Sequence, residues 1–166
     1  FSDLHVMAAG RRNEYGVDAA ACLMRCIEHL GALDAAPDLL VASGDLVDAG
    51  TVEDYRRLRE LLARVEMPVC LMPGNHDRRT PLRQVFNDQD YLGHSGRIHY
   101  QRMVRDLRVI ALDSVIEGRE GGDLDDVELQ WLDDLLCDQP EQPALVFMHH
   151  PPVATGREGS AAHWDH

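Results

Sequence analysis

Basic residues are scarce in this chain of 166 amino acids, which carries 16 lysines and arginines against 29 aspartates and glutamates. The formal net charge of -13 argues against the clustered cations that neutralise a phosphate backbone, so we expect no nucleic acid polymer as a partner. A small anionic substrate remains compatible, because metal cations bound in a site outweigh the global charge. The chain also lacks an apolar run of about 18 residues, so we expect no membrane span.

Cysteine is infrequent as well, with four residues at Cys22, Cys26, Cys70 and Cys137. Each falls at a predicted helix or strand position. We therefore interpret all four as buried thiols in a reducing compartment, rather than as disulfides or redox centres. This interpretation predicts a cytoplasmic protein.

The length and composition favour one domain over residues 1–166. With 45% hydrophobic and 27% charged residues, the chain resembles soluble globular proteins and can bury one sizeable core. It begins at Phe1 and stops at His166, soon after a loop-like stretch. We expect it to be part of a longer protein, lacking most of a first strand and a C-terminal part. A homo-oligomer is left open.

Apolar spacing predicts helices that alternate with strands. Helical spacing covers residues 17–33, the stretch after a capping box of Thr51 and Asp54, and residues 81–86 and 125–137. Short continuous apolar runs predict buried strands over 38–43, 69–72 and 144–148. Residues 98–104 and 107–113 flank Arg105-Asp106 as a two-residue hairpin. Trp131 is expected in the core. The alternation predicts a layered α/β fold whose sheets are not purely parallel.

Four short polar clusters recur along the chain, and at least three of them directly follow an apolar run. They are Ser2-Asp3-Leu4-His5, Gly44-Asp45, Gly74-Asn75-His76-Asp77 and His149-His150. Strands that end side by side gather such residues around a common point. Carboxylate oxygens, imidazole nitrogens and an amide carbonyl together suit Mn, Fe, Co or Zn, whereas calcium would need oxygens alone. The pattern therefore predicts a metal site.

The first two clusters each have a plainer alternative. Asp3 and His5 can bind one ion where a strand ends and twists, but such a pair is more often a solvated loop pair. Gly44 allows a close backbone approach, so the Asp45 carboxylate can bridge two metals. Alternatively Asp45 caps a helix or turn, a role to which Asp48 is better suited.

The third cluster is the most specific, because three consecutive polar side chains after a strand end have no packing explanation. Asn75 can offer its carbonyl to a metal, and His76 can remain outside the coordination sphere and donate a proton. Asp77 can then fix the tautomer of His76 by bonding the other ring nitrogen. His149 supplies one more imidazole after the last predicted strand, although a histidine pair is as often structural. Arg78 and Arg79 are expected to be solvated.

The order of these motifs resembles the calcineurin-like metallophosphoesterase superfamily. Residues 16–19, 43–48, 72–77 and 147–152 look more narrowly like its cyclic-nucleotide and glycerophosphodiester phosphodiesterase branch. The resemblance implies a four-layer α-β-β-α sandwich, the metallo-dependent phosphatase fold. It also implies a phosphodiesterase that hydrolyses a small phosphodiester, either a cyclic nucleotide or a glycerophosphodiester, with a hydroxide activated by two metal ions.

The same resemblance assigns roles to particular residues. Asp3 and His5 would bind the first ion, and Asp45 would bridge. Asn75 with His149 would bind the second ion. The predicted catalytic residues are His76, which would contact the phosphate or protonate the leaving group, and Asp77 beside it.

One departure from the family pattern concerns a Gly-His-x-His motif, which this chain does not contain. His163 and His166 have a different spacing, and we expect them to be loop residues near the substrate entrance. Two alternative functions stay open, a phosphomonoesterase on the same site and a degenerate, non-catalytic binding scaffold. A scaffold has no need for a polar cluster that is costly to desolvate.

Overall fold

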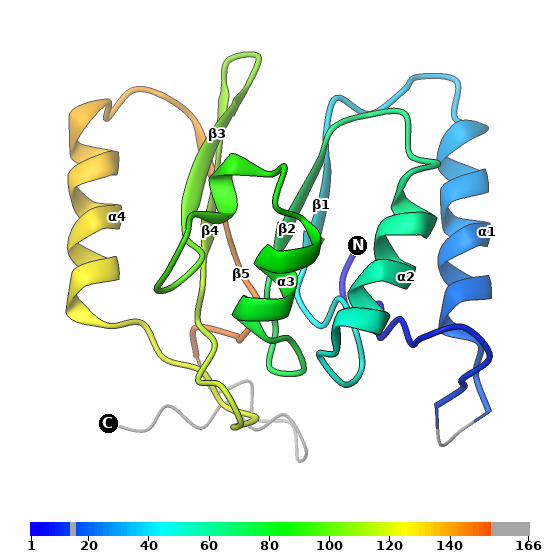
Figure 1. Ribbon diagram of the computed structural model, residues 1–166. Coiled ribbons are helices and arrows are strands. Elements are labelled where there is room, and N and C mark those ends of the chain that lie inside the picture. Colours follow the sequence, from blue (N-terminus) through cyan, green and yellow to red (C-terminus); the bar gives the residue numbers. More distant parts are fainter. Residues whose placement is uncertain (14–15, 154–166) are drawn as a thin grey trace.

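The chain folds into four layers in a computed structural model that describes residues 1–13 and 16–153 (Figure 1). The elements in chain order are α1 (Ala19–Gly31), β1 (Leu40–Ser43), α2 (Val52–Leu62), β2 (Val69–Met72), α3 (Arg79–Val85), the 3-10 helix η1 (Asp90–Leu92), β3 (Tyr100–Val104), β4 (Leu107–Leu112), α4 (Asp126–Asp138) and β5 (Ala144–Met148). From one side to the other, the layers are α1 with α2, the β1-β2 sheet, the β3-β4-β5 sheet, and α4. The predicted layered α/β architecture is confirmed.

The two sheets combine parallel and antiparallel pairing. Strand β1 runs parallel to β2 from Leu40 opposite Val69, and β4 runs parallel to β5. Strands β3 and β4 form the predicted antiparallel hairpin, in which Arg105 takes the left-handed backbone conformation of a tight turn, with φ 53°. Parallel pairing places the ends of β1 and β2 at one edge of their sheet, and the polar clusters begin there.

The helices begin where the sequence indicates. The Thr51 side chain accepts from the Asp54 backbone N–H, and the Asp54 carboxylate accepts from the Thr51 N–H, so the predicted capping box opens α2. Asp18 caps α1 through the Ala21 N–H, and Asp125 caps α4. Each α-helix begins within two residues of its predicted start, whereas α2 ends at Leu62, before the predicted last apolar position at Val65.

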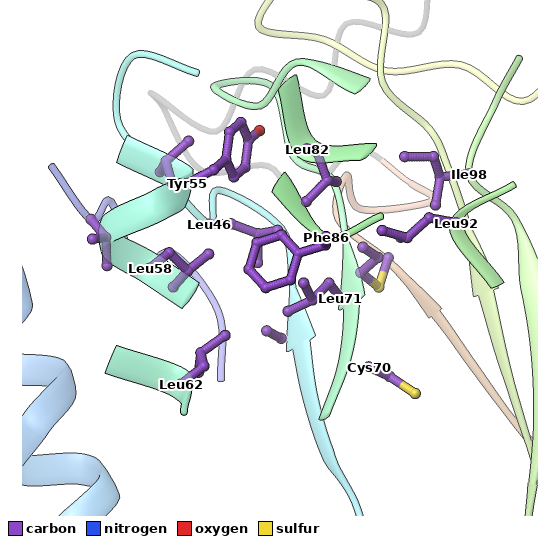
Figure 2. Close-up of a cluster of buried hydrophobic side chains, with 14 of the residues drawn as sticks. Leu46, Tyr55, Leu58, Leu62, Cys70, Leu71, Leu82, Phe86, Leu92 and Ile98 are labelled. Carbon is purple, nitrogen blue, oxygen red and sulfur yellow. The ribbon is translucent and has the colours of Figure 1, made fainter. Parts of the chain in front are cut away.

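The core lies between α2, α3 and the two sheets (Figure 2). Tyr55 and Leu58 from α2 meet Leu71 of β2, and all three side chains are almost fully buried. Tyr100 of β3 donates its hydroxyl to the Leu71 carbonyl over 2.9 Å, so the core joins the two sheets as well as the helix. Among the described residues, no helix is long and apolar enough to cross a bilayer.

The prediction that all four cysteines are buried is wrong. Only Cys70, on β2, is buried, whereas Cys22 is partly buried and Cys26 and Cys137 are exposed. The two exposed thiols lie on helices that bury one face only. A helical position therefore did not imply burial. All four thiols are free.

Helix α4 also differs from its predicted role, because its one buried residue is the charged Glu128. Val127 and Leu129 are 76% and 45% exposed, and Trp131 is half-buried against His99 rather than in the core. The Glu128 carboxylate accepts the Asp113 backbone N–H at 2.7 Å, and its second oxygen has no hydrogen-bond partner. This carboxylate, rather than an apolar stripe, directs the first turn of α4 toward the sheet.

Replacing Glu128 with glutamine is expected to remove part of the pH dependence of stability. Burial raises the pKa of Glu128 from 4.5 to about 7, so between these values the folded protein binds more protons than the unfolded chain. Wild-type stability therefore falls as the pH rises through this window, by about 3 kcal/mol relative to the glutamine variant. Urea unfolding at pH 5 and pH 8 measures the difference.

The matched control is Glu66→Gln, because Glu66 is exposed. We expect its unfolding free energy to follow that of the wild type at both pH values. Parallel behaviour of the Glu128 variant and the wild type would show that the buried carboxyl keeps an ordinary pKa.

Candidate metal centre

The side chains predicted to bind metal meet at one edge of the fold. Asp3 and His5 lie in the N-terminal segment, which runs beside the residues after β1 through bonds from the Asp3 N–H to Gly44 O and from the His5 N–H to Asp45 O. Asp45 follows β1, and the ligand atoms of Asp3, His5 and Asp45 lie within 4.8 Å of one another. The predicted first group is therefore assembled.

These three residues share an uncommon backbone conformation. The φ angles of Asp3, His5 and Asp45 are 55°, 43° and 48°, in the left-handed region that side chains other than glycine rarely adopt. A residue held there costs about 1–3 kcal/mol, and such residues cluster at functional sites. The fold thus uses strained backbone to aim three potential ligands at one point.

The second group contains Asn75 and His149. The His149 Nε2 atom lies 3.2 Å from Asn75 Oδ1 and 3.4 Å from Asp45 Oδ1. Its other nitrogen, Nδ1, is 3.0 Å from the Ser43 carbonyl, which can only accept, so Nδ1 carries a proton. Neutral His149 therefore presents a bare Nε2 toward Asp45 and Asn75.

Asp45 occupies the position between the two groups. Its Oδ2 lies 3.5 Å from His5 Nε2, and its Oδ1 lies 3.4 Å from His149 Nε2. Burial alone would raise the pKa of Asp45, but the bonds from His149 and from the His76 N–H outweigh it and lower the pKa. Burial likewise opposes the charge of His149, yet Asp45 holds the pKa of His149 above its usual value.

Two glycines make this close packing possible. A Cβ on Gly74 would overlap the backbone nitrogen and Oδ1 of Asp45 and would lie 2.8 Å from His149 Nε2. A Cβ on Gly44 would overlap the His149 ring. No other residue type fits at either position without displacing a candidate ligand.

His76 lies beside both groups. Its backbone N–H donates to Asp45 Oδ1 at 2.9 Å, and its ring meets the His5 ring edge-on, with 4.7 Å between centroids. Its Nδ1 lies 2.7 Å from the Asp48 carbonyl, so Nδ1 carries the proton and Nε2 can exchange one with a substrate.

The donor set suits a borderline transition metal. Two carboxylates, two imidazoles and one amide oxygen converge from separate segments, and a mixture of nitrogen and oxygen donors favours Mn, Fe, Co or Zn over calcium. The residues present therefore fit the predicted cofactor.

The sequence also matches the model of a known protein family. The model of the calcineurin-like phosphoesterase family matches residues 1–166. The chain belongs to the calcineurin-like phosphoesterase family.

Several curated relatives carry phosphodiesterase names. A probable glycerophosphodiester phosphodiesterase of Arcobacter nitrofigilis is 35% identical over 95% of this chain and 58% of its own length. A probable cyclic nucleotide phosphodiesterase of Rhodococcus erythropolis is 33% identical over 92% of this chain and 51% of its own length. The 3',5'-cyclic adenosine monophosphate phosphodiesterase of Pseudomonas aeruginosa is 32% identical over 95% and 56%. The chain thus spans little more than half the length of these calcineurin-like relatives.

The role predicted for Asp77 is wrong. Its carboxylate accepts the N–H groups of Leu46 and Gly74 at 3.0 and 2.8 Å and the Tyr55 hydroxyl at 2.7 Å, and Asp77 is 1% exposed. These bonds tie the loop after β2 to the core, whereas the His76 tautomer is set by the Asp48 carbonyl. Asp77 therefore holds the loop after β2 in place in this calcineurin-like site and does not orient the His76 ring.

Asp48 is a residue of the site that sequence reasoning missed. Its carboxylate Oδ1 lies 3.5 Å from His5 Nδ1, and its ligand atom groups with those of His5 and His76 within 4.8 Å. The sequence suggested a cap, but Thr51 caps α2. The available signal was a second aspartate three positions after Asp45, in the segment that follows β1.

The prediction that Arg78 and Arg79 are solvated is also wrong. Arg78 donates to the carbonyls of Asn75 and Asp77, and the Arg79 side chain, 16% exposed, pairs with buried Asp113. Both guanidinium groups therefore have partners within the fold. His163 and His166 lie outside the described residues.

Proposed function

We propose that this member of the calcineurin-like family is a hydrolase that cleaves small phosphodiesters with two bound transition metal cations. The observation that carries the proposal is the Asp45 carboxylate, whose two oxygens face two separate donor sets. One set comprises Asp3 and His5, and the other comprises Asn75 and His149. A carboxylate in this position can give one oxygen to each cation.

The cations would be Mn, Fe, Co or Zn, and when bound they lower the pKa of a water molecule and neutralise the charge of the phosphate. The protein contributes the positions of the donors. Strained backbone holds Asp3, His5 and Asp45, and the Ser43 carbonyl holds the His149 ring with Nε2 turned inward. Little reorganisation of these side chains is needed for binding.

His76 acts as the acid in this proposal. The Asp48 carbonyl accepts the Nδ1 proton, and a second proton on Nε2 makes the ring an imidazolium. The imidazolium gives its Nε2 proton to the leaving oxygen of a phosphodiester and becomes the neutral ring. The leaving group of a phosphodiester departs as an alcohol, and its oxygen needs such a proton. The backbone bond from His76 to Asp45 keeps this ring at a fixed place relative to the proposed metal bridge.

The substrate class proposed is a cyclic nucleotide or a glycerophosphodiester, the two kinds of diester that the names of the relatives print. The net charge of -13 fits a small diester held by cations better than a nucleic acid polymer. Exposed free thiols at Cys26 and Cys137 fit the reducing conditions of a cytoplasmic protein.

The proposal is tested with the full-length protein in a titration of Mn²⁺ or Co²⁺, on matched substrates that differ only in a second ester. We expect faster turnover of the diester and two metal equivalents, about 3.5–4 Å apart with Asp45 between them in anomalous scattering maps. Asp45→Asn should lose at least one equivalent and most of the turnover. Asp38→Asn is the control, since Asp38 pairs with Arg105 away from the site.

The other possible outcomes would favour the alternative functions or contradict the proposed metal bridge. Faster turnover of the monoester would make the protein a phosphomonoesterase. Metal binding without turnover of either ester would indicate a binding scaffold. A single ion that does not touch Asp45 would contradict the proposed bridge.

A further inference from the structure

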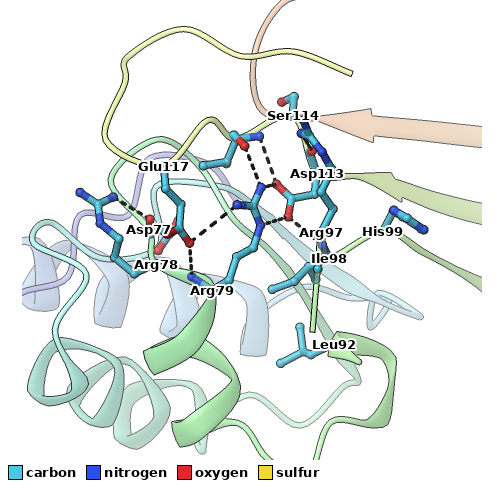
Figure 3. Close-up of polar contacts among 12 residues, drawn as sticks. Asp77, Arg78, Arg79, Leu92, Arg97, Ile98, His99, Asp113, Ser114 and Glu117 are labelled. Atoms are coloured by element: carbon cyan, nitrogen blue, oxygen red, sulfur yellow. Dashed lines mark hydrogen bonds and ion pairs between the residues drawn. The ribbon is translucent and has the colours of Figure 1, made fainter. Parts of the chain in front are cut away.

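Asp113, directly after β4, is the most heavily bonded carboxylate outside the proposed metal site. It is fully buried, and it accepts Arg79 Nε at 2.6 Å and Nη2 at 2.8 Å in a two-pronged ion pair (Figure 3). It also accepts the backbone N–H groups of Ile98 and Val115 at 2.7 and 3.1 Å. Such a satisfied carboxylate fixes the guanidinium in one orientation.

Arg79 connects this carboxylate to the loop that carries Asn75 and His76. It is the first residue of α3, a helix whose preceding residue Arg78 makes no side-chain cap. Instead, the Arg79 N–H donates to Glu117 at 3.1 Å, and its Nη2 also donates to the Val115 carbonyl at 2.7 Å. The end of the Asn75 loop is therefore anchored to the segment that follows β4.

Ser114 makes the corresponding connection to the other loop. Its hydroxyl lies 2.8 Å from Nδ1 of His150, the neighbour of the proposed ligand His149, and His150 Nε2 lies 3.1 Å from the Glu120 carbonyl. The carbonyl can only accept, so Nε2 carries the proton and Ser114 donates to Nδ1. A Cβ on Gly122 would overlap the His150 ring, so the ring fills a fitted space.

We propose that Asp113 and Ser114 form a brace that positions the two loops carrying the second metal's ligands. Asp113 holds the Asn75 loop through Arg79, and Ser114 holds the His149 loop through His150. Because Asp113 and Ser114 are consecutive, both loops are attached to the same short segment after β4. The proposal rests on the proposed function, in which Asn75 and His149 bind one cation between them.

The brace residues are positioning residues rather than ligands. The Arg79 side chain is directed toward the brace, because its Nε and Nη2 donate to Asp113 and Val115 and its Nη1 lies 3.7 Å from the Glu117 carboxylate. Loosening either hold should leave the Asp3 and His5 group intact, since the Asp3 and His5 N–H groups donate to Gly44 and Asp45 instead. We therefore expect the affinity for one cation to fall and the affinity for the other to stay unchanged.

The test uses Asp113→Asn and Ser114→Ala in the full-length protein. Co²⁺ is titrated into metal-free protein, and its visible absorption and binding heat report two affinities. We expect each variant to weaken one equivalent by about 10–100-fold, the usual effect of removing a partner that orients a ligand, and to leave the other unchanged.

Arg108→Lys is the matched control. Arg108 is buried at the start of β4, where it bonds the carbonyls of Leu135, Gln139 and Gln142, remote from the site. The change should lower the melting temperature without altering either Co²⁺ affinity. This separates a general loss of stability from a loss of ligand position.

Two unchanged affinities in both brace variants would overturn the proposal, whatever their melting temperatures. If Asp113→Asn does not fold, Ser114→Ala decides alone. If the wild type binds fewer than two equivalents, the proposed function fails and the brace is judged by amide hydrogen exchange in metal-free protein. Exchange about tenfold faster in Ser114→Ala over residues 149–150 would support the brace, and unchanged exchange would overturn it.

Discussion

Replacing His76 with alanine is expected to lower phosphodiester turnover by about 10²–10⁴-fold, the usual contribution of an acid–base residue. The reason is that Nδ1 is committed to the Asp48 carbonyl, while Nε2 remains for the leaving oxygen. Metal content should stay near the wild-type value, because the bond to Asp45 comes from the His76 backbone and survives the substitution. Steady-state kinetics combined with elemental analysis measures both quantities.

His94→Ala is the control for this prediction, because His94 is an exposed histidine in the loop before β3. It should retain wild-type turnover and metal. Loss of a full metal equivalent in His76→Ala would make His76 a ligand, in line with its place beside His5 and Asp48. Retained turnover would assign the proton transfer to another group.

Replacing Gly74 with alanine should disable the site although every candidate ligand remains. The added Cβ overlaps the backbone nitrogen and Oδ1 of Asp45 and lies 2.8 Å from His149 Nε2, so Asp45 and His149 must separate. Displacements of about 1 Å in a catalytic site cost about 10²-fold in rate, and we expect at least that loss. Metal titration should show weaker binding of both equivalents, since Asp45 serves both.

The matched control is Gly31→Ala at the end of α1, where a Cβ meets nothing within 4 Å and the backbone φ is not left-handed. This substitution should leave metal binding and turnover unchanged. Wild-type Co²⁺ affinity in Gly74→Ala would mean that the loop after β2 yields easily. That result would also argue against close packing of Asp45 on His149.

Local patterns in the sequence were enough to predict most of the fold. The buried strand 69–72 matches β2 residue for residue, and the Thr51 capping box opens α2 as expected. Such signals depend on neighbours in the chain. Where a side chain depends on distant partners, prediction failed: Asp77 bonds to Tyr55 and Leu46, which are 22 and 31 positions away.

The candidate site shows the same division. Strand ends and glycines marked Asp45, Asn75 and His149. The parallel strands β1 and β2 bring the first two to one end of their sheet, and His149 follows β5 of the second sheet. The partnership of Arg79 with Asp113 spans 34 positions and left no local trace. The prediction of which α4 residues are buried failed for a related reason. The buried residue is Glu128, whose carboxylate accepts the Asp113 N–H, and apolar periodicity does not reveal this contact.

The left-handed backbone of Asp3, His5 and Asp45 places activity and stability in opposition. At each of these positions glycine would adopt the observed φ without penalty, yet it would remove a donor. Selection for thermal stability alone would therefore drift toward glycine and lose the site. Libraries screened for heat resistance should hold these three positions fixed, because stabilisation gained there would come at the expense of turnover.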